Sequence, residues 1–161
     1  MIIGVLSDTH LRVGQTLPTR VWEELAEVDL ILHAGDILNP GVLTDLASLA
    51  PVEAVQGNCD GWELDQLPEQ KIVLCEGKRL GLIHGDYGQG KTTPERAFRA
   101  FPKGTVDVIV FGHSHSPYIE WREGILLFNP GSPTAKRREL KYSIGLLKID
   151  NTGIQAKHLY F

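Results

Sequence analysis

The chain has 161 residues, of which 42% are hydrophobic and 22% charged, a composition typical of a soluble globular protein with a substantial core. The formal net charge of -4 argues against a general affinity for the nucleic acid backbone, and no apolar run is long enough to span a membrane. The two cysteines, Cys59 and Cys75, make no disulfide framework, so we expect a cytoplasmic protein.

Short apolar runs alternate with helical patterns along the first two thirds of the chain. The runs are too short for helices and rich in β-branched residues, which indicates strands at Ile2–Leu6, Leu30–Leu32, Val52–Val55, Leu80–Ile83, Val108–Phe111 and Ile125–Phe128. The spacing of apolar residues predicts amphipathic helices over Thr19–Val28 and Val42–Leu49. A further helix is expected to start with Thr93 as its N-cap and Pro94 as its first residue.

The last third of the chain has a different pattern. The segments PYIEWREG, ILLFNPGS, YSIGLLKID and GIQAKHLYF are strands joined by short turns. We therefore predict βαβ units followed by a meander of strands. The fold class is α/β, with two packed, mainly mixed β-sheets flanked by helices, and residues 1–161 are expected to form a single domain. The exposed strands at the C-terminal end could pair between subunits in a homo-oligomer.

Polar side chains that suit metal binding follow each apolar run. In open α/β sheets, ligands bind at the carboxyl ends of the strands, so these loops should converge on one site. The loops are Ser7-Asp8-Thr9-His10, His33-Ala34-Gly35-Asp36, Gln56-Gly57-Asn58-Cys59-Asp60, His84-Gly85-Asp86, Gly112-His113-Ser114-His115 and Asn129-Pro130-Gly131-Ser132.

The convergent set combines imidazole, carboxylate and amide ligands. It consists of Asp8, His10, Asp36, Asn58, His84, His113 and His115. Imidazole and carboxylate together suit Mn, Fe, Zn or Ni, and the set exceeds what one tetrahedral zinc ion needs. It fits two divalent metal ions that share a bridging carboxylate, an arrangement that clamps both the attacking and the departing oxygen of a phosphoryl transfer.

The ordered motifs D-x-H, GD, GN, HG and GHSH resemble those of the calcineurin-like metallophosphoesterase family, and HAGD, GNCD and NPGS resemble its small bacterial and archaeal phosphodiesterase branch. The resemblance implies a metallophosphoesterase-like sandwich with two metal ions, Mn first among them. Hydroxide between the metals would attack the phosphorus of a small phosphoester, most readily a phosphodiester, in line. One metal would be held by Asp8, His10 and His115, the other by Asn58, His84 and His113, with Asp36 as the bridge.

The resemblance also suggests roles for the neighbours of these ligands. Asn58, Cys59 and His84 would act directly in catalysis, and His33 and Asp60 would support the ligands from behind, although Asp60 could equally be a turn residue. In the wider family the position of Cys59 is usually a histidine that protonates the leaving oxygen. Cys59 is therefore interpreted as a weaker replacement, which favours phosphodiesters with acidic leaving groups. A metal thiolate and an ordinary thiol are the alternatives.

Other polar residues carry weaker signals. The HG motif is followed by Asp86, where the family often has a second histidine. The NPGS turn is expected to support the site through its backbone. Lys136, Arg137 and Arg138 are interpreted either as a solvated turn or as contacts to the substrate phosphate. Cys75 is expected to pack in the core, and His158 to lie on the surface.

Two other functions compete with phosphoester hydrolysis. Gly85–Thr92 matches the P-loop pattern G-x-x-x-x-G-K-[ST] after a strand, which would indicate nucleotide binding. Pro94 biases Thr93 away from helix, however, so the helix should begin too late to cradle phosphate. A scaffold branch of the family, which includes the retromer subunit, acts through protein contacts with an eroded metal site. Metal content and turnover of a generic phosphodiester would separate these functions.

Overall fold

Two five-stranded mixed sheets stack face to face in the computed structural model, which describes residues 1–161. The first sheet has the order β10-β9-β1-β2-β3 and the second the order β4-β5-β6-β8-β7. The strands of the first sheet are β1 (Ile2–Leu6), β2 (Leu30–His33), β3 (Val52–Ala54), β9 (Ser143–Asp150) and β10 (Gly153–Tyr160). Those of the second are β4 (Gln70–Cys75), β5 (Lys78–Ile83), β6 (Val108–Val110), β7 (Tyr118–Arg122) and β8 (Ile125–Asn129).

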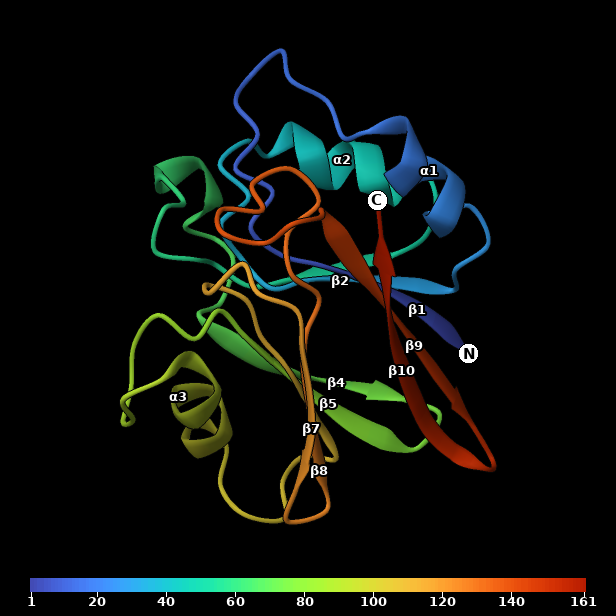
Figure 1. Cartoon of the computed structure of the whole chain (residues 1–161), viewed down its shortest axis with the longest axis vertical. Helices are drawn as coiled ribbons and strands as arrows, with labels where there is room; N and C mark the ends of the chain where they lie inside the picture. The colour runs from blue at the N-terminus through green and yellow to red at the C-terminus, as the bar shows by residue number, and fades with distance from the viewer.

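Helices cover the outer faces of the two sheets (Figure 1). The first sheet carries α1 (Thr19–Leu25) and α2 (Gly41–Ala47), the second carries α3 (Thr93–Ala100), and a short 3-10 helix spans Trp62–Leu64. The predicted fold class of two mixed sheets flanked by helices is therefore confirmed. None of the helices combines the length and the apolar character needed to cross a bilayer.

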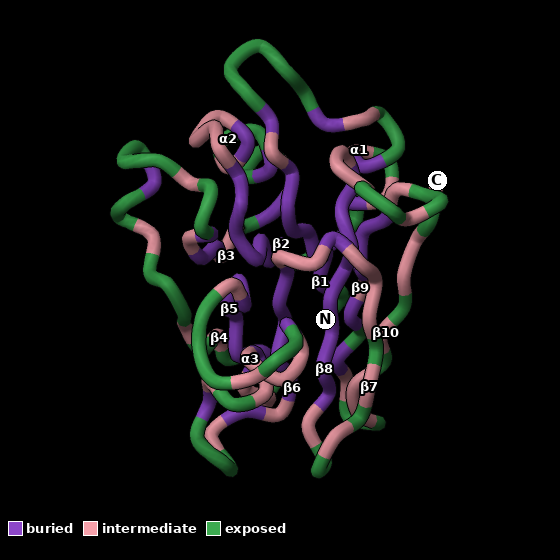
Figure 2. The backbone as a smooth tube through the Cα atoms, turned by 60° about the vertical axis from the view of Figure 1, so that its left-hand side comes forward, coloured by how far each residue is buried: buried purple, intermediate pink, exposed green.

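The apolar residues divide into a core between the sheets and one under the helices of each face. Val5, Leu32, Val110 and Phe128 are fully buried between the two sheets. Figure 2 shows that the buried residues follow the central strands, whereas exposed residues concentrate in the connecting loops. The burial of these apolar side chains makes the largest favourable contribution to the stability of the fold.

The register of the strands brings their carboxyl ends level. In the first sheet β1 runs parallel to β2, with Leu6 opposite His33. In the second sheet β6 runs parallel to both β5 and β8, and Val110 is opposite Phe128. The loops that follow these strands therefore leave both sheets at the same end of the molecule, which is where the polar motifs lie.

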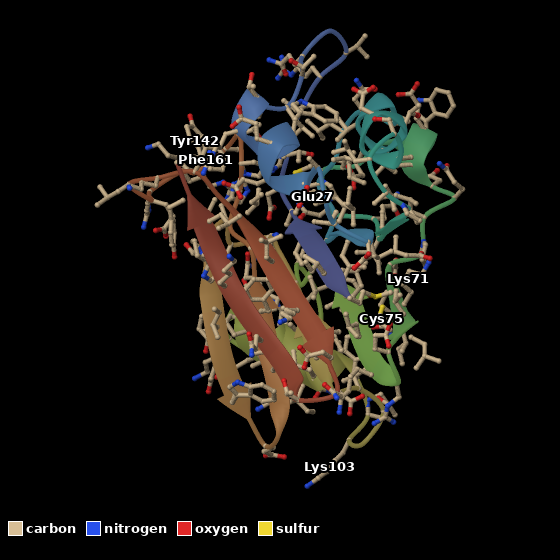
Figure 3. The ribbon with its side chains drawn as sticks, turned by 90° about the vertical axis from the view of Figure 1, so that its right-hand side faces the viewer. Glu27, Lys71, Cys75, Lys103, Tyr142 and Phe161 are labelled. Atoms are coloured by element: carbon tan, nitrogen blue, oxygen red, sulfur yellow. The ribbon has the colours of Figure 1, made fainter.

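The expected C-terminal meander is wrong, because its four strands are divided between the two sheets. The β7–β8 hairpin joins the second sheet, where β8 pairs in parallel with β6. The β9–β10 hairpin joins the first sheet, where β9 pairs antiparallel with β1. Figure 3 shows this hairpin, with Tyr142 and Phe161 side by side where it meets the rest of the chain. Each hairpin thus completes a different sheet of the sandwich.

Smaller corrections concern the ends of elements and one histidine. The first two helices end at Leu25 and Ala47, earlier than predicted. The N-cap of α3 is Thr92 rather than Thr93, and its hydroxyl accepts the N–H of Glu95, 3.4 Å away. His158, which was expected on the surface, is half-buried. Its ring stacks on Phe128 and its Nε2 lies 2.6 Å from the carbonyl oxygen of Asn129, because this side of β10 faces the second sheet.

Candidate metal centre

All seven residues of the predicted ligand set meet where the two sheets end. Nε2 of His115 lies 3.3 Å from Oδ1 of Asp8. Oδ2 of Asp36 lies 3.4 Å from Nε2 of His10 and 3.3 Å from Nε2 of His84. Nδ1 of His113 lies 3.1 Å from Oδ1 of Asn58. The ligands come from loops that follow β1 and β2 in one sheet and β5 and β6 in the other, and from the loop after β3.

Three overlapping groups of side chains in this cluster have the spacing of a metal site. Within each group the donor atoms lie within 4.8 Å of one another. The groups are Asp8, His10 and His115; Asp8, Asp36 and His84; and His10, Asp36 and Cys59. The first group matches one of the two ligand sets that the resemblance implies. Asp36 shares one group with His10 and another with His84, so it lies between the two halves of the centre.

Two buried atoms of the cluster have no hydrogen-bond partner in the protein. They are Oδ1 of Asp8 and Nε2 of His84, which are 4.0 Å apart. Buried polar atoms are almost always paired, and unpaired ones concentrate at functional sites. A carboxylate oxygen and an imidazole nitrogen that are both unpaired are suitable donors for a divalent cation. The residues present therefore fit a metal ion.

The protonation states of the ligands also suit a cation. Burial raises the pKa of Asp8 to about 7, so a positive charge nearby would be needed to keep the carboxylate ionised at low cost. Burial lowers the pKa values of His10 and His113, and lowers that of His115 to about 4, so these rings are neutral near pH 7. Neutral imidazole is the form that binds metals.

Nε2 of His84 and Oδ2 of Asp36 lie 3.3 Å apart without forming a hydrogen bond, and the two residues shift each other's pKa in opposite directions. Burial alone would raise the pKa of Asp36, but the contact with His84 and the N–H of Cys59 hold that pKa well below its ordinary value. Burial opposes the charge of His84, yet Asp36 and Asp8 raise the pKa of His84 to about 9. Both shifts have the direction expected of a position that attracts positive charge.

Backbone strain concentrates at the same place. Five of the seven ligands have a left-handed backbone, with φ of 55° at Asp8, 45° at His10, 56° at Asp36, 66° at His113 and 60° at His115. A non-glycine residue rarely adopts this conformation, which is found mainly where function requires it. Glu76 and Glu123 are also left-handed, but each precedes a glycine in a hairpin turn. The ligands do not lie in hairpin turns of this kind, and their left-handed backbone coincides with the place where their side chains meet.

The carboxylate of Asp60 organises the two loops that carry Asp36 and Asn58. It accepts the backbone N–H groups of Asp36 at 3.0 Å, Ile37 at 2.6 Å, Leu38 at 2.8 Å and Gly57 at 2.8 Å. A Cβ atom at Gly57 would lie 2.3 Å from the backbone nitrogen of Asp36, so only glycine permits this approach. This geometry agrees with the supporting role expected for Asp60.

His33 lies behind the cluster and contacts none of the seven ligands through a hydrogen bond. Its ring is fully buried, and Nε2 lies 3.1 Å from the hydroxyl of Thr9. The ligands are oriented by main-chain carbonyls instead. Nδ1 of His84 lies 2.7 Å from the oxygen of Ala34, and Nδ1 of His115 is hydrogen-bonded to that of Ala135. Such partners fix the tautomer of a ligating ring, and no side-chain motif in the sequence indicates them.

The NPGS turn supports the centre through its side chains, whereas support through its backbone was expected. The amide of Asn129 donates to the oxygen of Gly112 at 2.8 Å and contacts the hydroxyl of Ser114 at 3.1 Å. The hydroxyl of Ser132 donates to the oxygen of Asp8 at 2.8 Å. These bonds tie the loops of His113 and Asp8 to the end of β8.

Cys59 lies at the exposed side of the centre. Its partial burial and the neighbouring charge of Asp36 raise the pKa of its thiol to about 11, so the thiol keeps its proton near pH 7.

The P-loop interpretation of Gly85–Thr92 finds no support in the backbone. Helix α3 begins only after Thr92, and the carboxylate of Glu95 accepts the N–H of Lys91 at the place where a nucleotide phosphate would bind.

Comparison with known families decides the affiliation. The family model described as the calcineurin-like phosphoesterase superfamily domain matches residues 1–152. The chain belongs to this superfamily. The resemblance carried by the motifs of the sequence is thereby confirmed.

Curated relatives match most of the length of this chain. A probable metallophosphoesterase of Methanothermobacter thermautotrophicus is 40% identical over 98% of this chain and 91% of its own. The phosphodiesterase YfcE of Escherichia coli is 33% identical over 93% of this chain and 89% of its own.

Solved structures show the same fold at lower identity. Vps29 of Entamoeba histolytica in complex with zinc has a TM-score of 0.79 and 20% identity, over 99% of both chains. A structure described as that of a novel archaeal phosphodiesterase has a TM-score of 0.75 and 23% identity, over 99% of this chain and 100% of its own. The same sandwich fold therefore occurs in proteins with different names.

Proposed function

We propose that this protein is a metal-dependent phosphodiesterase whose residues 1–161 act as one domain around a dinuclear centre. The observation that carries the proposal is the meeting of seven ligand-type side chains. Asp8, His10, Asp36, His84 and His115 have the spacing of a metal site, and His113 links Asn58 to His84. Oδ1 of Asp8 and Nε2 of His84 are buried there without a hydrogen-bond partner. Membership of the superfamily and relatives named as phosphodiesterases support the same conclusion.

The ligands divide into two sets around a shared carboxylate. Asp8, His10 and His115 would hold one ion, and Asn58, His84 and His113 the other, with Asp36 between them. The donor types suit Mn, Ni, Fe or Zn. When bound, two such ions would supply Lewis-acid stabilisation of charge on the phosphoryl oxygens and increase the acidity of water.

The chain itself provides orientation and protection of the ligands. Asp36 is kept ionised and is fixed by the N–H of Cys59 at 2.8 Å. Asp60 holds the backbone around Asp36 through its three hydrogen bonds to that loop. In-line attack on a small phosphoester, as expected from the resemblance, is part of this proposal.

The thiol of Cys59 limits which substrates are favoured. A thiol with a pKa near 11 gives up its proton less readily than the histidine usual at this position. Leaving groups that depart without a proton, such as phenolates, should therefore react best. This property favours phosphodiesters of acidic alcohols as the substrate class.

A non-enzymatic scaffold is the second candidate, and the likeness to Vps29 structures favours it. To separate the two, the protein is stripped of metal, reloaded with Mn, Ni, Fe or Zn, and assayed on aryl phosphodiesters and monoesters. We expect diester turnover that depends on added metal. Binding of two ions without turnover of any ester would favour the scaffold, and failure to bind metal would overturn the proposed centre.

A further inference from the structure

The loop that follows the NPGS turn, residues 133–139, is fixed against the metal centre. The hydroxyl of Thr134 donates to the oxygen of Thr9 at 2.5 Å, and the oxygen of Ala135 accepts Nδ1 of His115. The hydroxyl of Ser132, just before the loop, donates to the oxygen of Asp8. The loop is therefore attached to the backbone or side chains of residues in the D-x-H and GHSH motifs, and whatever it carries is held at the site.

Three basic residues lie in this loop, and the first of them is used internally. Nζ of Lys136 donates to the oxygen of Glu139 at 3.0 Å and lies 5.7 Å from the centre of the Tyr142 ring. Glu139 is in turn bound by the hydroxyl of Ser116 at 2.6 Å. These contacts close the loop on itself, so Lys136 serves the conformation of the loop rather than a ligand.

Arg137, unlike Lys136, makes no hydrogen bond or cation–π contact within the loop. It is exposed and has no hydrogen bond or ion pair with any side chain. It follows Ala135 by two residues, and the oxygen of Ala135 accepts a hydrogen bond from Nδ1 of His115, so the backbone of Arg137 is held beside the centre. Its positive charge also lowers the pKa values of His10, His115 and Cys59. Arg138 has no comparable effect on these groups. Of the three basic residues, Arg137 is the one whose charge acts on residues of the centre.

The backbone at Arg137 is strained in the same way as the ligands. Its φ is 49°, in the left-handed region, and no glycine follows it as in the hairpin turns at Glu76 and Glu123. Strain of this kind persists where the surroundings require a particular side-chain direction. With the five ligands and Leu38, Arg137 completes the set of left-handed non-glycine residues around the centre.

We propose that Arg137 binds the phosphate group of the substrate at the opening of the metal centre; this inference rests on the proposed function. The inner side of the centre is formed by carboxylates and imidazoles, so a guanidinium at its edge adds a permanent positive charge that these groups do not supply. The planar guanidinium presents two parallel N–H donors that match two phosphate oxygens, which an ammonium group cannot do. A single guanidinium also matches the single negative charge of a phosphodiester.

The test compares Arg137→Ala with the neighbouring control Arg138→Ala, both loaded with the same metal. Binding of inorganic phosphate is measured by titration calorimetry, independently of turnover, and metal content by mass spectrometry. We expect Arg137→Ala to weaken phosphate binding about 10- to 100-fold, the loss typical of a charge-assisted contact, with metal content unchanged. Arg138→Ala should stay within about twofold of the parent, since this change removes the same charge without the contact.

Kinetics and a conservative variant separate binding from a structural effect. Arg137→Ala should raise KM for an aryl phosphodiester by more than it lowers kcat, and Arg137→Lys should recover part of the loss because the charge returns without the planar fork. Equal effects of Arg137→Ala and Arg138→Ala, or a loss that follows metal content, would overturn the inference. A parent that binds phosphate through Arg137 but hydrolyses no ester would instead refute the proposed function and leave the phosphate site standing.

Discussion

The backbone N–H of Cys59 donates a 2.8 Å hydrogen bond to Oδ1 of Asp36. This bond joins the GNCD loop to the carboxylate that lies between the two halves of the centre. It belongs to the main chain, so a change of the Cys59 side chain leaves it in place, whereas a change of Asp36 removes it. Mutation of each residue can therefore test the role of the Cys59 side chain separately from that of the Asp36 carboxylate.

Substitution of Cys59 should affect leaving groups unequally. Cys59→Ala should keep its metal and most of its activity on an aryl phosphodiester, because a phenolate departs without a proton. Cys59→His should help most on alkyl or nucleoside esters, whose leaving oxygens need protonation. The measurement is kcat/KM across leaving groups of rising pKa. Loss of all activity or of metal in Cys59→Ala would identify Cys59 as a nucleophile or a ligand.

The thiol of Cys59 should react slowly with alkylating agents at neutral pH. Its pKa of about 11 leaves little thiolate at pH 8, so alkylation of the metal-free protein should be about 100-fold slower than that of a free cysteine. The rate should rise with pH up to about 11, since the thiolate is the reactive form. Asp36→Asn should accelerate the reaction by removing a negative charge. Peptide mapping distinguishes alkylation of Cys59 from that of the buried Cys75. A rate at Cys59 equal to that of free cysteine would contradict the raised pKa of its thiol.

Asp36→Ala should abolish turnover and lower the bound metal while leaving the fold intact. Asp36 is the carboxylate proposed to contact both ions, and its Oδ2 faces both His10 and His84. The exposed Asp45 of α2 provides the control Asp45→Ala, which should behave as the parent. Metal content, circular dichroism and the rate on an aryl phosphodiester are compared. Full activity in Asp36→Ala would exclude the dinuclear centre.

Asp60→Asn should weaken metal binding by about 10- to 100-fold, the range found for residues that orient metal ligands. An amide cannot accept the four N–H groups that the carboxylate of Asp60 accepts, so the loops of Asp36 and Asn58 should loosen. Asp65→Asn is the matched control, because Asp65 is exposed and bonds only Gln56. Titration of each protein with Mn gives the affinity, and equal values for the two variants would argue against the role of Asp60.

Lys91→Ala should leave phosphodiesterase activity within about twofold of the parent. A P-loop lysine contacts nucleotide phosphates through its side chain, so its loss would remove ATP binding. In this protein the backbone N–H of Lys91, not its side chain, bonds Glu95. Calorimetric titration with ATP should show no tight binding before or after the change. Tight binding that Lys91→Ala removes would restore the P-loop interpretation.

Much of the fold was predictable because the strands are short apolar runs that end in conspicuous polar motifs. The order of those motifs was also sufficient to assemble the ligand set around Asp36. The sequence could not show that β9 pairs with β1, because an apolar strand carries no mark of its distant partner. It could not show the left-handed backbone at His113 or the acceptor role of the Ala34 carbonyl either, because both depend on the main chain rather than on residue type.

The link between Asp8 and Ser132 joins residues that are 124 positions apart in the chain, and β1 is paired with β9 from the far end of the sequence. Contacts of such long range close slowly, because the entropy of a large loop is lost before the contact is gained. At about 5–20 residues per second of synthesis, the edge of β1 that pairs with β9 stays unpaired for several seconds, until the ribosome has made the residues between the two strands. The hydrogen bonds from Ser132 to Asp8 and from His115 to Ala135 can therefore form only once the C-terminal third of the chain has been made, so tight metal binding at the proposed centre would report folding of the late part of the chain as well as the early part.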